Sequence, residues 1–221
     1  MAGAALPCQA VNPLDLLTVA VLAFVGFRLA DAARQTLTSR SEVWPLVTGL
    51  RLRHFLRAIP VLGAVLIVAT PLIQIPGLDF GWWTALGGQG NPVVGVGRPG
   101  ATPGVLETLI PAVFVTLLIL GLPLLVEGEE WVFRRGAEHR SRAANARRSV
   151  IFGLVHAAVG IPIGVALALS IGGFYFTWAY LRVWRRTASE SAALAESTRS
   201  HLAYNLVIAV LIIAALATGS A

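Results

Sequence analysis

Seven residues in the second half of the chain have the side-chain types and the spacing that hydrolytic chemistry requires. They are two adjacent acids, an arginine one turn further on, two histidines, and an aromatic or amide residue one turn from each histidine: Glu129, Glu130, Arg134, Phe152, His156, His201 and Asn205. All lie within or at the ends of apolar segments, where ionisable groups are costly and commonly mark a functional site. Their order predicts one site assembled from successive helices.

The residue types indicate what such a site can do. A carboxylate held in a poorly solvated cavity is a competent general base for a water molecule. His201 and Asn205, four residues apart, share one helix face, and N–H donors there can stabilise the oxyanion of a tetrahedral intermediate. Glu130 and Arg134 have the same spacing, which predicts a supporting ion pair. Taken singly, an intramembrane histidine or asparagine is commonly just a hydrogen-bond partner between helices.

The composition places these residues in a membrane protein. The chain has 221 residues, of which 56% are hydrophobic and 13% charged, and its mean hydropathy is +0.75. The apolar residues fall in long charge-free blocks, which soluble domains of this length lack. The single cysteine, Cys8, excludes an intrachain disulfide framework.

The net charge of +6 comes from 17 arginines and no lysine. Most of the arginines lie in three clusters, at 34–57, 134–148 and 182–199. Clusters beside apolar blocks are typical of cytoplasmic loops and of contacts with lipid headgroups. Membrane lipids are therefore expected partners, and nucleic acid is not.

The apolar blocks predict an all-α, polytopic integral membrane protein with about six membrane-inserted helices and both termini outside. The long blocks are 14–29, 58–78, 105–134 and 201–217. The uncharged stretch 149–181 is too long for one crossing and short for two, and arginines at both ends place both ends in the cytoplasm. It is predicted to enter from a Ser149 N-cap, to end a short helix at Gly160-Ile161-Pro162, and to return. The whole chain, 1–221, is expected to be a single transmembrane domain, with the motifs in 104–217.

Polar connections are expected on the cytoplasmic side. Segment 43–56 has the composition of an amphipathic helix in the membrane interface, with His54 on its solvated face. The arginine-rich connection 136–149 is expected to keep Glu138 and His139 in solvent.

Two further connections complete the predicted topology. Segment 187–200 is expected to be a polar cytoplasmic entry to the last helix. The glycine-rich segment 77–104 lacks the Gly-Lys-Ser/Thr of a phosphate-binding loop. It is therefore predicted to be an external loop in which Trp82 and Trp83 anchor the chain at the membrane interface.

Three motifs together resemble those of one enzyme family. Glu129-Glu130-x-x-x-Arg134, Phe152-x-x-x-His156 and His201-x-x-x-Asn205, in this order on successive helices, resemble the motifs of the CPBP family of CAAX proteases and bacteriocin-processing enzymes, which includes the Ras-converting CAAX endopeptidase. The resemblance covers about 106–217. Each motif is short and recurs by chance, so their order and matching depth carry the resemblance. Family members commonly have glycine after the motif arginine, where this chain has Arg135, which puts only the local packing of that helix end in question.

The resemblance implies a membrane-embedded endopeptidase whose site opens to the cytoplasm. Glu129 would activate the water, as the only motif acid expected to face both histidines. His156 would orient that water, and His201 and Asn205 would bind the oxyanion. Supporting roles would fall to Glu130, Arg134 and Phe152. The expected substrate is a membrane-associated or lipid-modified peptide or protein, and the all-arginine usage fits a prokaryotic chain.

Alternatives to this interpretation stay open. Two histidines and a glutamate match the ligand set of a catalytic zinc, but the chain has no His-Glu-x-x-His. No cofactor is therefore favoured, and zinc remains an option. A non-catalytic membrane scaffold or immunity-type protein is one alternative class, and a small proton-coupled transporter is another. The donor pair on the last helix favours hydrolysis, because a proton relay needs no oxyanion donors.

Overall fold

The computed structural model describes residues 13–38, 40–81 and 105–218. The α-helices are α1 (Pro13–Thr38), α2 (Arg40–Thr48), α3 (Leu52–Leu72), α5 (Val105–Arg134), α6 (Arg142–Val155), α7 (Ile163–Thr187) and α8 (Glu190–Thr218), and the 3₁₀ turns are η1 (Ala137–His139) and η2 (His156–Val159). In these ranges all regular structure is helical, which confirms the all-α class. Residues 82–104 of the predicted external loop, with Trp82 and Trp83, and both chain ends fall outside the described residues.

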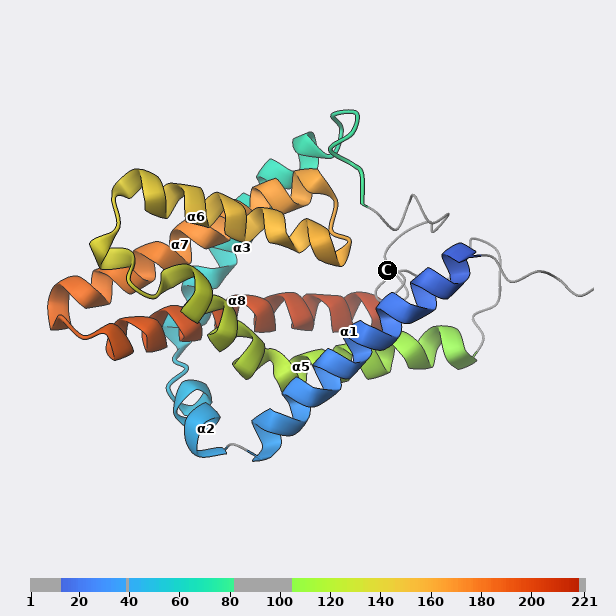
Figure 1. The fold of residues 1–221 in the computed structure, drawn as a ribbon, viewed down its shortest axis with the longest axis horizontal. Coiled ribbons are helices and arrows are strands. Elements are labelled where there is room, and N and C mark those ends of the chain that lie inside the picture. Colours follow the sequence, from blue (N-terminus) through green and yellow to red (C-terminus); the bar gives the residue numbers. More distant parts are fainter. Residues whose placement is uncertain (1–12, 39, 82–104, 219–221) are drawn as a thin grey trace, which may run out of the picture.

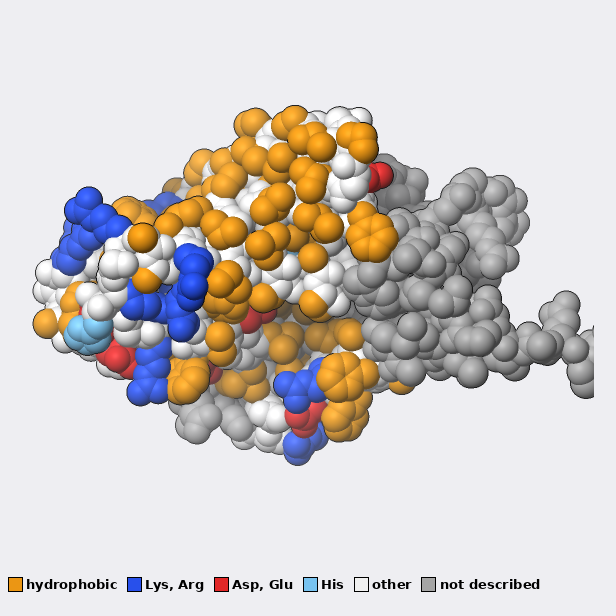
Figure 2. All heavy atoms as spheres, turned by 45° about the horizontal axis from the view of Figure 1, so that its top comes forward, with side chains coloured by type: hydrophobic (Ala, Val, Ile, Leu, Met, Phe, Trp, Pro, Cys, Tyr) orange, Lys and Arg blue, Asp and Glu red, His pale blue; other side chains and the backbone are white. Residues whose placement is uncertain are grey.

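Three helices in the described ranges are long and apolar enough to cross a membrane: α3, α7 and the Glu190–Ala214 part of α8. Large apolar side chains on these helices point outward, among them Leu66 and Ile67 of α3, which are 56% and 74% exposed. Figure 2 shows hydrophobic side chains spread over one face, while basic side chains lie at the left-hand end and in a smaller group at the lower edge. A continuous exposed apolar surface of this kind is typical of a membrane protein.

Helix α8 runs through the middle of the molecule (Figure 1). It packs against α3, α5 and α7, whereas α1 lies along α5 and α6 lies along α7. The last turn of α5 contacts α6, through Phe133 and Arg134 against Phe152, and the two helices lie on opposite sides of α8 in Figure 1. The three motif-bearing segments thus meet around α8.

Two glycines set the close approach of α6 to α7. A Cβ atom at Gly153 would lie 2.4 Å from the carbonyl oxygen of Ala166, and one at Gly173 would lie 2.6 Å from that of Ser149. Small residues at helix interfaces let backbones approach this closely in membranes. The Ser149 and Thr177 hydroxyls lie 3.2 Å apart across the same interface. This contact fixes α6, and with it the second motif, against α7.

The turn between α5 and α6 is closed by its own side chains. Gly136, with φ +73°, ends α5 in the left-handed region that favours glycine. Gly136 directly follows Arg135 and so lies two residues after the motif arginine, Arg134. Arg140 Nη2 donates to the carbonyl oxygens of Phe133 and Arg134 at 2.9 and 3.1 Å, which satisfies the end of α5.

The start of α6 differs from the prediction, and its end agrees with it. Ser141, not Ser149, is the N-cap, because its Oγ accepts from Ala144 N at 3.2 Å. The arginine-rich connection is mostly helical as a result. The helix ends through η2 at Gly160, whose φ of +93° lies in the left-handed region. The predicted break at Gly160 is confirmed.

Two predicted solvent-facing residues are buried. His54 is fully buried, with its Nδ1 accepting from Arg51 N at 2.9 Å and its Nε2 lying 3.4 Å from Glu196 Oε2. The side chain of Glu138 is 3% exposed and accepts from the Tyr180 hydroxyl at 2.8 Å. Both predictions were wrong because the partners come from distant helices, which local polarity does not reveal.

Two segment predictions also change. Most of 187–200 belongs to α8, which begins at Glu190 rather than near His201. Segment 43–56 is not one helix, since α2 ends at Thr48 and α3 begins at Leu52. At this break Arg199 of α8 donates to Pro45 O at 3.0 Å and lies over Gly49, where a Cβ would lie 2.2 Å from Arg199 Nε.

Candidate active site

A cavity of about 310 Å³ lies between α5, the α6–η2 segment, α7 and α8. Most of its wall is apolar. Its polar lining residues are Glu129, His156, His201, Tyr204 and Asn205, and Phe152 also lines it. The structure thus brings Glu129, both histidines and Asn205 to one cavity, although they come from three separate segments.

Glu130 and Arg134 lie behind this wall as a buried ion pair. Both residues are fully buried, and Arg134 Nε lies 3.5 Å from Glu130 Oε2. The predicted pairing is therefore present. The guanidinium also covers the Phe152 ring, 4.1 Å from its centroid, and Nη2 donates to Gly173 O at 3.4 Å. These contacts join the end of α5 to both α6 and α7.

His201 contacts both acids, but the closer one is Glu130. Its Nδ1 lies 2.9 Å from Glu130 Oε1, and its Nε2 lies 3.8 Å from Glu129 Oε2. Glu130 contacts His201 from behind the cavity wall, whereas Glu129 lines the cavity together with both histidines. Adjacent helical residues point about 100° apart, so only one glutamate can face fully inward. That residue is Glu130, while the Glu129 side chain is 40% exposed.

The Glu130 contact fixes how His201 holds its protons. A carboxylate paired with Arg134 accepts hydrogen bonds, so Nδ1 of His201 is the donor. In a neutral ring Nε2 would then be an acceptor facing another acceptor, the Glu129 carboxylate. Nε2 can therefore donate a hydrogen bond only when it carries a proton as well.

His156 is held in a defined tautomer by its own helix. Its Nδ1 lies 2.8 Å from the carbonyl oxygen of Phe152. A carbonyl only accepts, so Nδ1 carries the proton, and Nε2 of the neutral ring is left as an acceptor. His156 lines the cavity, where this nitrogen can receive a hydrogen bond from water or ligate a metal.

Phe152 packs its ring against the rings of both histidines. Its ring meets the rings of His156 and His201 edge to face, at 5.1 and 5.4 Å. The other face of His201 stacks on Phe176 at 4.2 Å. This aromatic packing holds both imidazoles in fixed orientations, which hydrogen bonds alone would leave free to swing.

Two residues of the site were missed from the sequence. Ser197 is buried, and its hydroxyl contacts Glu130 Oε2 from α8. Tyr204 lines the cavity one residue before Asn205. A sequence signal exists for each: with His201 they follow the four-residue and three-residue spacings that share one helix face. Ser197 was overlooked because it falls in the stretch assigned to a cytoplasmic connection.

Within the described ranges, no three histidine, cysteine, aspartate or glutamate side chains lie in an arrangement that could hold a metal ion. Comparisons with protein-family models, with curated proteins and with solved structures gave no match. A functional assignment therefore has to start from the cavity and its lining residues.

Proposed function

We propose that this protein is a membrane-embedded endopeptidase that hydrolyses a peptide bond with a glutamate-activated water. One observation carries the proposal: an acid and three potential hydrogen-bonding side chains, Glu129, His156, His201 and Asn205, line one largely apolar cavity. The resemblance of the three motifs to those of the CPBP family supports the same activity.

The proposed reaction gives each polar motif residue of the cavity a defined role. Glu129 removes a proton from a water molecule that also donates to His156 Nε2, and the water oxygen attacks the carbonyl carbon. The negative charge that develops on the carbonyl oxygen is stabilised by His201 Nε2–H and the Asn205 amide. The proton on Glu129 then passes to the leaving amine as the C–N bond breaks. Glu130 is a positioning residue here, because its contact with Nδ1 fixes the orientation of the His201 ring.

The same cavity argues for the kind of substrate. Its wall is mostly apolar side chains of α5, α7 and α8, which suit a membrane-associated or lipid-modified peptide or protein. No cofactor is part of this mechanism. The zinc alternative, with Glu129, His156 and His201 as the ligand set, would need an arrangement of these side chains that differs from the one described here.

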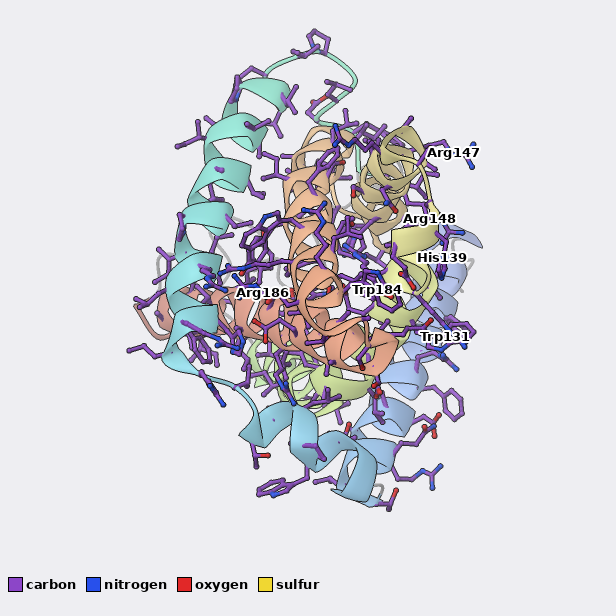
Figure 3. All side chains as sticks on the ribbon, turned by 90° about the vertical axis from the view of Figure 1, so that its left-hand side faces the viewer. Trp131, His139, Arg147, Arg148, Trp184 and Arg186 are labelled. Carbon is purple, nitrogen blue, oxygen red and sulfur yellow. The ribbon has the colours of Figure 1, made fainter. Side chains whose placement is uncertain are left out.

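We further propose that the protein sits in the cell membrane with this site facing the cytoplasm. The proposed topology has about six membrane-inserted helices and both termini outside. Figure 3 views the arginine-bearing end of the molecule and labels Trp131, His139, Arg147, Arg148, Trp184 and Arg186 there. Arginines gather on the cytoplasmic side of membrane proteins, and tryptophans lie at the interface. Lipid headgroups are the proposed partners of this end.

Substitution of the cavity residues tests the activity. Glu129→Ala, His156→Ala and His201→Ala should each abolish cleavage of a peptide library in detergent, and Asn205→Ala should lower the rate roughly 100-fold to 1000-fold. The control is His139→Ala, whose side chain is 76% exposed and outside the cavity. It should cleave at the wild-type rate.

The outcomes separate the alternatives. Cleavage by Glu129→Ala would refute the endopeptidase. Stoichiometric zinc in the purified protein, lost in His156→Ala and His201→Ala, would overturn the metal-free mechanism. A folded wild-type protein that cleaves nothing but moves protons in vesicles would favour a transporter, and one that does neither would favour a membrane scaffold or immunity-type protein.

A further inference from the structure

Ser197 contacts the two groups that hold the His201 ring in place. Its hydroxyl donates to Glu130 Oε2 and lies 2.9 Å from the carbonyl oxygen of Phe176. Glu130 Oε1 lies 2.9 Å from His201 Nδ1, and the Phe176 ring stacks on the imidazole at 4.2 Å. These four residues therefore form a closed set of contacts that joins α5, α7 and α8.

The Glu130 carboxylate needs a contact that fixes its plane. The last torsion of a glutamate side chain is soft, so the side chain alone does not decide where each oxygen points. Arg134 balances the charge, but its Nε lies 3.5 Å from Oε2 and makes no hydrogen bond to the residues that the structure describes. The Ser197 hydroxyl does donate a hydrogen bond to this oxygen. A carboxylate that is held at Oε2 keeps Oε1 directed at His201 Nδ1.

We propose that Ser197 is a positioning residue that aims the Glu130 carboxylate at His201. Ser197 and His201 lie four residues apart on α8, so the hydroxyl and the imidazole share one helix face. A fixed carboxylate holds Nδ1, and with it the direction of Nε2 on the other side of the ring. The effect on cleavage rests on the endopeptidase activity proposed above, in which Nε2 binds the oxyanion.

Ser197→Ala tests the inference, because it removes only the hydroxyl oxygen from the side chain. The rate constant kcat should fall about 10-fold to 100-fold with KM nearly unchanged, because a small displacement of a catalytic group has an effect of this size. The NMR resonances of the His201 ring nitrogens, assigned by comparison with His201→Ala, should shift as well. They respond to the hydrogen bond at Nδ1, which a tyrosine, serine or threonine with a purely structural role would leave unchanged.

Thr198→Val is the matched control. Thr198 is the next residue on α8 and is also buried, but its hydroxyl donates to Leu194 O of the same helix at 2.9 Å. This variant should keep the wild-type kcat and the wild-type His201 resonances. An equal loss of kcat in both variants would overturn the inference, as would a Ser197→Ala variant with a wild-type kcat or a change in KM alone.

The resonances separate this inference from the activity on which it depends. They report the hydrogen bond at His201 whether or not the protein cleaves peptides. Unmoved His201 resonances in Ser197→Ala would overturn the positioning role, even where the rate falls. A folded wild-type protein that cleaves no peptide would overturn the endopeptidase, and the resonances would still decide whether Ser197 orients His201.

Discussion

Removing the negative charge of Glu130 should lower the free energy of unfolding of the protein. Its carboxylate is fully buried and has three partners, Arg134 at 3.5 Å, His201 at 2.9 Å and the Ser197 hydroxyl. Glu130→Gln keeps the shape but leaves the Arg134 guanidinium buried without a counter-charge. Breaking one partner of a buried ion pair costs about 3–5 kcal/mol, a large share of the stability of a typical domain.

A second substitution isolates the charge effect. Arg134→Met replaces the stranded guanidinium with an apolar side chain of similar length, and buried pairs replaced as a whole are often nearly neutral. We therefore expect Glu130→Gln/Arg134→Met to recover at least about 2 kcal/mol relative to Glu130→Gln. Activity should not return, because His201 would still lack the carboxylate on Nδ1.

Reversible unfolding in mixed detergent micelles, followed by tryptophan fluorescence, measures each free energy of unfolding. The wild type, Glu130→Gln, Arg134→Met and the double variant form a double-mutant cycle, which gives the coupling energy between Glu130 and Arg134 directly. A Glu130→Gln variant within about 0.5 kcal/mol of the wild type would refute the reasoning, since surface-like substitutions have effects of that size. A double variant no more stable than Glu130→Gln would show that the stranded charge is not the cause.

Two further pairs of variants test the packing by the same unfolding measurement. Gly153→Ala should cost about 1–3 kcal/mol, because its Cβ would collide with α7. Gly63→Ala has open space around it and should gain about 0.5–1 kcal/mol from helix propensity; a loss in both would contradict the role of the close approach. His54→Ala should cost about 2 kcal/mol, because it removes the acceptor for Arg51 N at the start of α3 and empties the space of a fully buried ring. The exposed His139→Ala should stay within about 0.5 kcal/mol, and equal effects of the two histidines would contradict the buried position of His54.

The extent of α5 and the helix ends at Gly136 and Gly160 were predictable because local features of the sequence indicate them. Helix α5 was predicted to begin at Val105 and to end before Gly136, and it runs to Arg134. Gly160 ends the short segment as expected. Such signals are local: an uncharged run sets the length of a helix, and a glycine with positive φ ends it.

What the sequence concealed depends on contacts between distant segments. The start of α8 was misplaced because hydropathy reports contact with lipid, whereas Ser197 and Glu196 face protein partners on α5 and α3. The motif residues were identified, but the contact between Glu130 and His201 was not. Which of the two adjacent glutamates turns inward depends on how α5 is rotated about its axis, which adjacent identical side chains cannot reveal.

The central place of α8 also determines when the site can exist. Glu130 and His201 are 71 residues apart in the chain, whereas the turn from α5 to α6 is closed by neighbours such as Arg140 and Phe133. Synthesis proceeds from the N-terminus, and local contacts form before distant ones. A growing chain can therefore complete the α5–α6 joint while the cavity still lacks the wall that carries His201 and Asn205. Helix α8 follows α5 and α6 in the chain, so the nascent protein has no complete site until α8 is in place.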